Sequence, residues 1–161
     1  MFNLKAEQHL KIILLFSFIA ITSAYFIEYV LGYQPCNLCL IERIPYGLSI
    51  ILIITILVLK KNQKFLVLLL ILTFIFSLAI SFYHFGIEQG FFQESSVCGV
   101  KSSTEIVTKE DLLKQLSEKT ISCKDVTFRI FGLSLTSINI VISLLFIITL
   151  SKVIKKYEKN K

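Results

Sequence analysis

The sequence predicts an all-α membrane protein: a four-transmembrane-helix bundle with a short interfacial helix in its second extracytoplasmic loop. Composition, the spacing of apolar segments and the distribution of positive charge support this fold class. Hydrophobic residues make up 55% of the 161 residues, whereas soluble domains average about 45–50%. The hydrophobic residues are concentrated in four long segments, and a helix needs roughly 20 apolar residues to cross a bilayer.

The four predicted helices belong to one integral membrane domain that covers residues 1–161. They span residues 12–31, 39–59, 65–83 and 131–151, and loops 32–38 and 85–130 lie on one side of the membrane. The second helix is long enough only if it begins near Cys39. That start places Glu42 and Arg43 at the membrane interface.

A cleaved signal peptide is the alternative for the first segment. Lys5 and Lys11 would form its basic region, and Thr22-Ser23-Ala24 resembles a cleavage site. The apolar run continues to Leu31, however, which is longer than the apolar core of a signal peptide. The length therefore favours a retained transmembrane helix.

Positive charge predicts the orientation of the bundle. The two termini and the loop 60–64 carry ten of the 17 Lys and Arg residues. Since such residues are enriched on the cytoplasmic side, both termini should be cytoplasmic and the two longer loops should lie on the opposite side, which is the periplasm if the membrane is a bacterial inner membrane. The net charge of +6 is then a consequence of topology, and we predict no binding to nucleic acid.

The second periplasmic loop contains the predicted short helix, at residues 108–119. Thr108 is a suitable N-cap with Asp111 three residues later, and Val107 can pack on Leu112 across that cap. One apolar stripe with charged residues behind it is typical of a helix that lies on membrane lipid. Packing of the same stripe on the ends of the bundle fits equally well, and both interpretations stay open.

All four cysteines, Cys36, Cys39, Cys98 and Cys123, fall on the periplasmic side of this topology. Disulfides persist in oxidising compartments, and an even number of cysteines there indicates disulfide chemistry. A zinc site is disfavoured because the second pair is separated by 24 residues and lacks knuckle spacing, and we predict no metal. Leu40 follows Cys39, which excludes the C-x-x-C-H motif of c-type haem attachment.

The C-x-x-C pair at Cys36 and Cys39 favours a redox role, because a bond that closes so few residues removes little unfolded-state entropy. Near the start of a helix, Cys39 should be stabilised as a thiolate. Arg43, four residues later, can approach the same face. The alternative for Arg43 is an interfacial residue paired with lipid phosphate or with a nearby acid.

Three other ionisable residues lie near the predicted membrane surface on this side. His84 is a candidate functional residue at the end of the third helix; its alternative is an interfacial histidine bonded to a carbonyl group or a headgroup. Glu28 is expected to be a wetted interface residue without a role. For Glu42 the sequence offers no explanation.

Four motifs, PCNLCLIER, FYHFGIEQGFF, SVCG and SCKDVTFRIFGLSLTSIN, resemble the DsbB family of bacterial disulfide-generating membrane proteins. The resemblance covers nearly the whole chain and implies a four-helix bundle with one redox pair in each periplasmic loop. It also implies that the protein oxidises a soluble periplasmic DsbA-like thiol oxidase. Many family members have tryptophans after the last cysteine, where this chain has Phe128 and Ile138.

The resemblance implies a role for each candidate site residue. Cys98 would form the mixed disulfide with the partner, and Cys123 would exchange with Cys36. Cys39 would pass electrons to a quinone, either ubiquinone or menaquinone. Arg43 occupies the position of the family's quinone-side arginine, and His84 lies near a histidine linked to the quinone site.

Other functions remain compatible with the residues. A related quinone-linked thiol oxidoreductase with a dedicated partner, or one that runs toward reduction like vitamin K epoxide reductases, shares the same chemistry. Two alternatives involve different chemistry. One is a non-enzymatic membrane protein with two structural disulfides, such as an assembly subunit, and the other is a metal-binding membrane module. Pro35 is expected to end the first loop and to present Cys36 toward the second cysteine pair.

Overall fold

The computed structural model describes residues 4–59, 62–94, 98, 122–124, 129–130 and 132–159. Within these residues it contains helices α1 (Leu4–Tyr29), α2 (Asn37–Leu59), α3 (Gln63–Glu88) and α5 (Leu135–Lys159), and strands β1 (Arg129–Ile130) and β2 (Leu133–Ser134). All four helices are long and apolar enough to cross a membrane. The predicted all-α bundle of four spans is thereby confirmed. The helix predicted at 108–119 lies outside the described residues.

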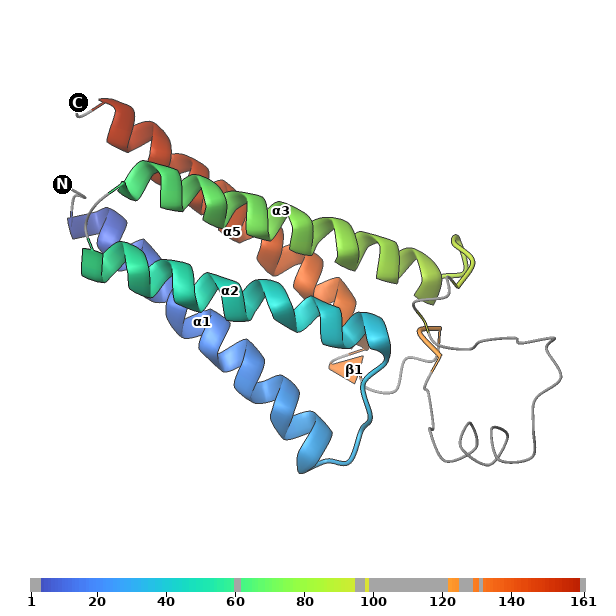
Figure 1. Ribbon diagram of the computed structural model, residues 1–161. Coiled ribbons are helices and arrows are strands. Elements are labelled where there is room, and N and C mark those ends of the chain that lie inside the picture. Colours follow the sequence, from blue (N-terminus) through green and yellow to red (C-terminus); the bar gives the residue numbers. More distant parts are fainter. Residues whose placement is uncertain are drawn as a thin grey trace, which may run out of the picture.

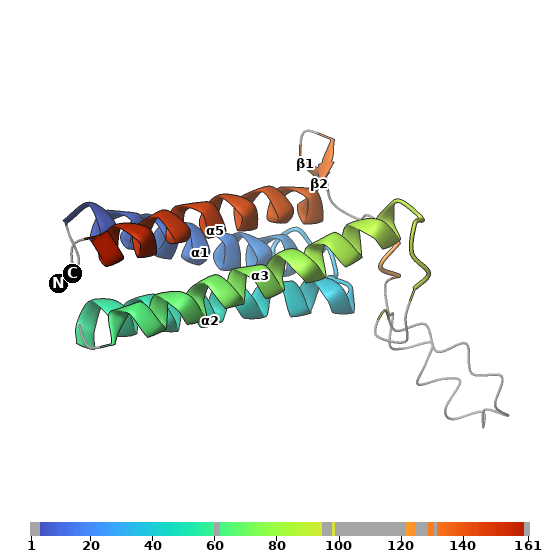
Figure 2. The same ribbon diagram turned by 90° about the horizontal axis from the view of Figure 1, so that it is seen from above.

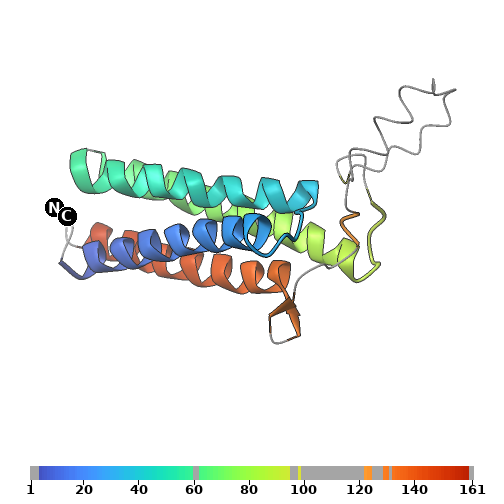
Figure 3. The same ribbon diagram turned by 90° about the horizontal axis from the view of Figure 1, so that it is seen from below.

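The helices form an elongated bundle in which the start of α1, the α2–α3 turn and the end of α5 lie at one end (Figure 1). Viewed from above and from below, α2 and α3 form one layer, and α1 and α5 form the other (Figures 2 and 3). Extensive contacts join α3 to α5 and to α2, and α2 to α1, whereas α1 and α5 touch over a short stretch. The bundle is therefore least closed between α1 and α5.

Aromatic side chains fill the interior at the middle of the bundle. The ring of Phe74 is fully buried and lies edge-to-face on Phe146, with ring centroids 4.9 Å apart, and on Tyr46, at 6.2 Å. Small hydroxyl residues hold neighbouring helices together: Ser49 on α2 donates to Ser17 on α1 at 2.9 Å. Small polar residues of this kind let transmembrane helices approach closely, since apolar side chains gain little by leaving lipid.

Helix α3 continues to Glu88, beyond the predicted end at residue 83. The additional turn contains His84 and Gly86, which hydropathy alone excludes, but both residues are buried. The helix ends where Gly90 adopts a left-handed conformation, with φ +77°, and the N–H of Phe91 donates to the carbonyl of Gly86 at 2.8 Å. The extension carries His84 and Glu88 on the same helix face, four residues apart.

Helix α5 begins at Leu135, and the predicted start at residue 131 is wrong. Strands β1 and β2 pair as a short antiparallel hairpin before it, with Gly132 in the left-handed region at φ +82°. The side chain of Ser134 then caps the helix, because its Oγ accepts a hydrogen bond from the backbone N–H of Ser137 at 3.2 Å. The later start places Thr136 in the first turn, at the cysteine end of the bundle.

Candidate functional site

The first cysteine pair is built into the start of α2. The carbonyl oxygen of Cys36 accepts from the N–H of Leu40 at 3.2 Å, and its Sγ atom accepts from the N–H of Cys39 at 3.3 Å. Cys36 therefore occupies the N-cap position of α2, with its sulfur in the place of the usual capping oxygen. The Sγ atoms of Cys36 and Cys39 lie 2.7 Å apart.

The second pair lies against the first. Cys98 and Cys123 are buried, with 1% and 2% of their surface exposed, and they share one apolar cluster with Cys36, Leu38 and Ile87. Cys36 thus faces Cys123, away from lipid. The structure gathers all four cysteines at the end of the bundle opposite the start of α1 and the end of α5 (Figure 1).

The pKa values of the Cys36 and Cys123 thiols are shifted in opposite directions. A hydrogen bond from Cys39, together with a hydrogen bond and positive charge from His84, lowers the pKa of Cys36 to about 4, despite its burial. Burial and a hydrogen bond with Cys98 raise the pKa of Cys123 above its usual value. We expected the lowered thiol pKa on Cys39; the contacts with the Cys39 thiol and with His84 instead lower the pKa of Cys36.

His84 lies between the cysteine pair and a buried carboxylate. Its Nε2 atom is 3.6 Å from Sγ of Cys36, and its Nδ1 atom is 3.0 Å from Oε1 of Glu42 and 3.2 Å from Oγ1 of Thr136. Glu42 is thereby explained: its carboxylate holds the imidazole, and its Oε2 accepts from Nδ2 of Asn139 at 3.3 Å. His84 is buried, with 2% exposure, so it is not an interfacial histidine.

Asn139 on α5 connects three helices. Its Nδ2 donates to Oγ of Ser81 on α3 at 2.7 Å, and its Oδ1 accepts from the hydroxyl of Tyr46 on α2. Thr136 lies one turn earlier on the same face and donates to Oε1 of Glu88 at 2.8 Å. Sequence reasoning missed both α5 residues. The signal was present, since Thr136 and Asn139 are polar residues three positions apart inside an apolar span.

Arg43 is held by an acid on the neighbouring helix. Its Nη1 lies 2.5 Å from Oε2 of Glu28 on α1, and its guanidinium lies over the ring of Tyr25, 5.1 Å from the centroid. The side chains of Arg43 and Glu28 are only 16% and 20% exposed. Glu28, to which we assigned no role, therefore fixes the position of the Arg43 guanidinium.

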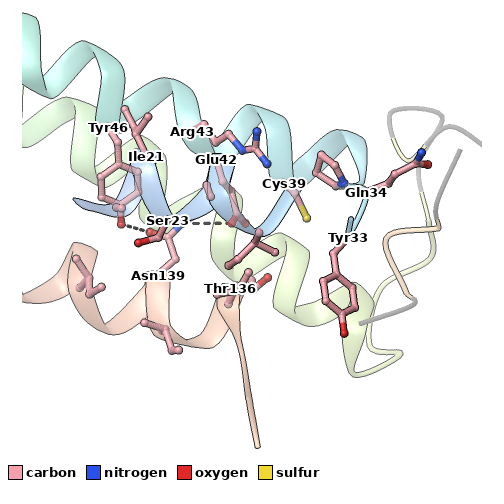
Figure 4. A pocket seen from close by; sticks show the side chains of 17 residues that line it. Ile21, Ser23, Tyr33, Gln34, Cys39, Glu42, Arg43, Tyr46, Thr136 and Asn139 are labelled. Atoms are coloured by element: carbon pink, nitrogen blue, oxygen red, sulfur yellow. Dashed lines mark hydrogen bonds between the residues drawn. The ribbon is translucent and has the colours of Figure 1, made fainter. Parts of the chain in front are cut away.

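A pocket of about 260 Å³ opens beside these residues, between α1, α2 and α5. Figure 4 shows Cys39, Glu42 and Arg43 on α2 facing Thr136 and Asn139 on α5 across it. Apolar side chains of α1 and α5, such as Ile21 and Ile142, form most of the remaining wall. His84 does not line the pocket and lies behind Glu42. Ligand sites of this kind combine an apolar wall with a few convergent polar groups.

The donor atoms of Cys36, Cys39 and His84 lie within 4.8 Å of one another. Two thiolates on a tetrahedral zinc ion, each about 2.3 Å from the metal, are about 3.8 Å apart. The sulfurs here are 2.7 Å apart. This spacing suits direct sulfur–sulfur chemistry, and the arrangement as it stands is not that of a zinc site.

Comparisons with known proteins agree with the arrangement of helices and cysteines. The family model "Disulfide bond formation protein DsbB" matches residues 7–152. The chain is also similar to "Uncharacterized protein RP370" of Rickettsia prowazekii (strain Madrid E), with 30% identity over 152 residues, which cover 93% of this chain and 88% of that protein. Both matches extend across all four helices.

Proposed function

Because the chain belongs to the DsbB family of disulfide bond formation proteins, we propose that it is a membrane thiol oxidase that re-oxidises a periplasmic DsbA-like protein and passes the electrons to a membrane quinone. The observation that carries the proposal is the juxtaposition of two cysteine pairs with one pocket. Cys36 lies in the buried cluster with Cys98 and Cys123, whereas Cys39 lines the pocket.

The positions of the sulfurs give the thiol exchange a direction. A thiolate of the partner attacks the Cys98–Cys123 disulfide at Cys98, and the partner's second thiol then resolves the mixed disulfide. Cys123, now reduced, attacks Cys36 of the Cys36–Cys39 disulfide, a bond forms between Cys123 and Cys36, and Cys39 leaves as a thiolate. The leaving sulfur is the one that faces the pocket. Cys98 then attacks Cys123, which restores the Cys98–Cys123 disulfide and releases Cys36.

The residues of the pocket suit a quinone ring. Arg43 donates to Glu28 through Nη1 and has further guanidinium N–H groups for a carbonyl oxygen. The apolar wall suits the rest of the ring. The short contact between α1 and α5 offers a lateral entry from lipid. When bound, the quinone supplies an acceptor for two electrons and two protons. Ubiquinone and menaquinone share this chemistry.

A high-potential acceptor is needed because DsbA-like oxidases have reduction potentials of about −120 mV, and ordinary disulfides, whose potentials are lower, re-oxidise them poorly. The proposal places the protein in a bacterial inner membrane, with both termini cytoplasmic and the cysteines periplasmic. The basic residues at the termini and in the loop 60–64 support this orientation.

Trapping of the partner tests this function. Full-length protein carrying Cys123→Ser, mixed with a reduced DsbA-like protein, should accumulate a mixed disulfide through Cys98 that is visible on a non-reducing gel. The matched variant Cys98→Ser should accumulate none. Two purely structural disulfides would give no adduct in either variant and would resist mild reductant in the wild-type protein, and that result would overturn the proposal.

A further inference from the structure

Three buried side chains form a continuous line from the thiol cluster to the pocket. Cys36, His84 and Glu42 are 5%, 2% and 9% exposed. The line runs from Sγ of Cys36 to Nε2 of His84, over 3.6 Å, and from Nδ1 of His84 to Oε1 of Glu42, over 3.0 Å. Cys36 does not line the pocket but Glu42 does. The line therefore joins the pocket to the sulfur that lies away from it.

The hydrogen bonds around His84 determine which ring nitrogen carries a proton. The hydroxyl of Thr136 donates its hydrogen to Oε1 of Glu88, so toward Nδ1 of His84 it can only accept. The carboxylate of Glu42 also accepts from Nδ1. Nδ1 is therefore protonated, and Nε2 faces the sulfur of Cys36 and takes its proton when that sulfur ionises. This is the order of nucleophile, base and orienting carboxylate found in hydrolytic triads.

A second carboxylate adds charge to the same cluster. Oε1 of Glu88 lies 3.9 Å from Nε2 of His84, and the side chain is only 5% exposed. Its Oε2 is buried without a hydrogen-bond partner among the described residues. One imidazolium cannot compensate two buried carboxylates and a thiolate, and buried charges without partners are costly. The cluster of Cys36, His84, Glu42 and Glu88 therefore retains at least one proton that can move within it.

We propose that His84 and Glu42 carry the proton of Cys36 to the pocket while the Cys36–Cys39 disulfide forms. The inference rests on the proposed function. Two thiols become one disulfide, and two electrons and two protons reach the acceptor. The proton of Cys39 enters the pocket directly. The proton of Cys36 is held on Nε2 of His84 while that sulfur is a thiolate. The proton on Nδ1 then passes to Glu42, and Glu42 delivers it to an acceptor oxygen in the pocket.

His84 and Glu42 thereby take roles that thiol exchange alone does not require. His84 is the base for Cys36, and Glu42 both orients His84 and faces the acceptor. The other charged groups close to this line are Glu88, on the same helix as His84, and Arg43, whose guanidinium is engaged by Glu28. General acid–base groups of this kind contribute about 10²–10⁴-fold to a rate.

A single-turnover experiment separates this route from simple thiol chemistry. Fully reduced full-length protein in detergent is mixed with excess short-chain ubiquinone, and formation of the Cys36–Cys39 disulfide is followed from pH 6 to pH 8. The wild-type rate should vary little with pH. In Glu42→Gln the rate should fall about 100-fold at neutral pH and rise with pH. Without this carboxylate His84 no longer holds the proton of Cys36, and hydroxide from solvent must remove it.

Two further variants serve as controls. Glu42→Asp keeps a carboxylate and should recover part of the rate together with a flatter pH profile. Glu7→Gln makes the same chemical change near the start of α1, at the other end of the bundle, where Glu7 pairs with Lys11 at 2.9 Å on the surface. Its rate and pH profile should match those of the wild type. Each variant should retain four titratable thiols after reduction.

The outcomes are distinct. A wild-type rate in Glu42→Gln would overturn the inference and leave the proposed function intact. A slow Glu42→Gln protein with an unchanged, flat pH profile would indicate a structural role for Glu42 and would also overturn it. A wild-type protein that the quinone does not oxidise would overturn the proposed function, and the inference with it.

Discussion

The Sγ atom of Cys36 accepts a hydrogen bond from the backbone N–H of Cys39 at 3.3 Å, so one cysteine of the pair caps the helix that holds the other. Orphan N–H groups and the helix dipole favour negative charge at this position. These groups favour a thiolate on the sulfur next to Cys123. Under the proposed function, the sulfur that lines the pocket would act on the acceptor.

The pH dependence of alkylation tests that placement. Because the pKa of Cys36 is lowered from 9.0 to about 4, its reaction with iodoacetamide should change little between pH 8 and pH 6 and should fall as the pH drops through the folded-state value. Cys123, whose pKa is raised by burial, should instead react faster with each rise in pH. Peptide mass spectrometry of the reduced protein measures both sites in one sample.

The same shift links the stability of the reduced protein to pH. A thiol with a lowered folded-state pKa stabilises the fold fully above its unfolded value of 9.0, and this contribution is lost as the pH falls through about 4. In the alkylation experiment, a rate of Cys36 modification that rises tenfold per pH unit between pH 6 and pH 8 would contradict the lowered pKa of Cys36.

Removal of the Asn139 amide should destabilise the bundle. Asn139→Ala takes a partner from Tyr46, Glu42 and Ser81 on two other helices, and each buried polar group left without a partner costs about 1–3 kcal/mol. Unfolding of purified protein in detergent should show a clear loss of stability. Val141→Ala, which shortens a 56% exposed side chain on the same helix, should cost far less. Equal effects would show that the network contributes no more than ordinary packing.

A methyl group at Gly86 should displace Phe92. A Cβ atom at this position would lie 2.1 Å from Cδ2 of Phe92, and the Phe92 ring stacks on Tyr83 with centroids 5.7 Å apart. Overpacking costs about 1–3 kcal/mol, and because the Phe92 side chain is 44% exposed, Gly86→Ala should fall at the low end. Adding Phe92→Ala should remove the clash, so a thermal-unfolding double-mutant cycle should show coupling. Strictly additive effects would contradict the contact.

Substitution of Arg43 should weaken the use of quinone. A hydrogen bond from a charged donor is worth about 1.5–3 kcal/mol, so Arg43→Met should raise the KM for short-chain ubiquinone by about 10- to 100-fold. Arg43→Lys keeps the charge and should have an intermediate effect. Glu28→Gln leaves the guanidinium in place and removes only its partner, so it should have the smallest effect. An unchanged KM in Arg43→Met would exclude Arg43 from the quinone site.

Hydropathy and charge were sufficient to predict the four helices, because a membrane span depends on length and composition, both of which are visible in one segment. The ends of the helices were less predictable. The last turn of α3 holds His84 and Gly86, which are polar or small, yet tertiary packing buries them. The start of α5 depends on the Ser134 cap and on the turn at Gly132, and hydropathy registers neither.

The topology was sufficient to predict that the four cysteines lie at one end of the bundle, where the structure clusters them, but the polar residues beside them were not predicted. Glu42 and Asn139 are 97 residues apart along the chain. Their contact depends on the rotation of α2 against α5, which one sequence does not specify. The ion pair of Arg43 with Glu28 on α1 depends in the same way on the packing of neighbouring helices. The lowered pKa of Cys36 depends on its contacts with the Cys39 thiol and with His84, and His84 lies on another helix.

The most direct measurement combines the full-length protein in detergent, a reduced DsbA-like protein and short-chain ubiquinone, and counts quinol formed against partner thiols lost. The account predicts one quinol for each pair of partner thiols, with turnover abolished by serine at any of the four cysteines. Full turnover in Cys39→Ser, or loss of partner thiols without formation of quinol, would contradict the transfer of electrons from Cys98 and Cys123 through Cys36 and Cys39 to the pocket.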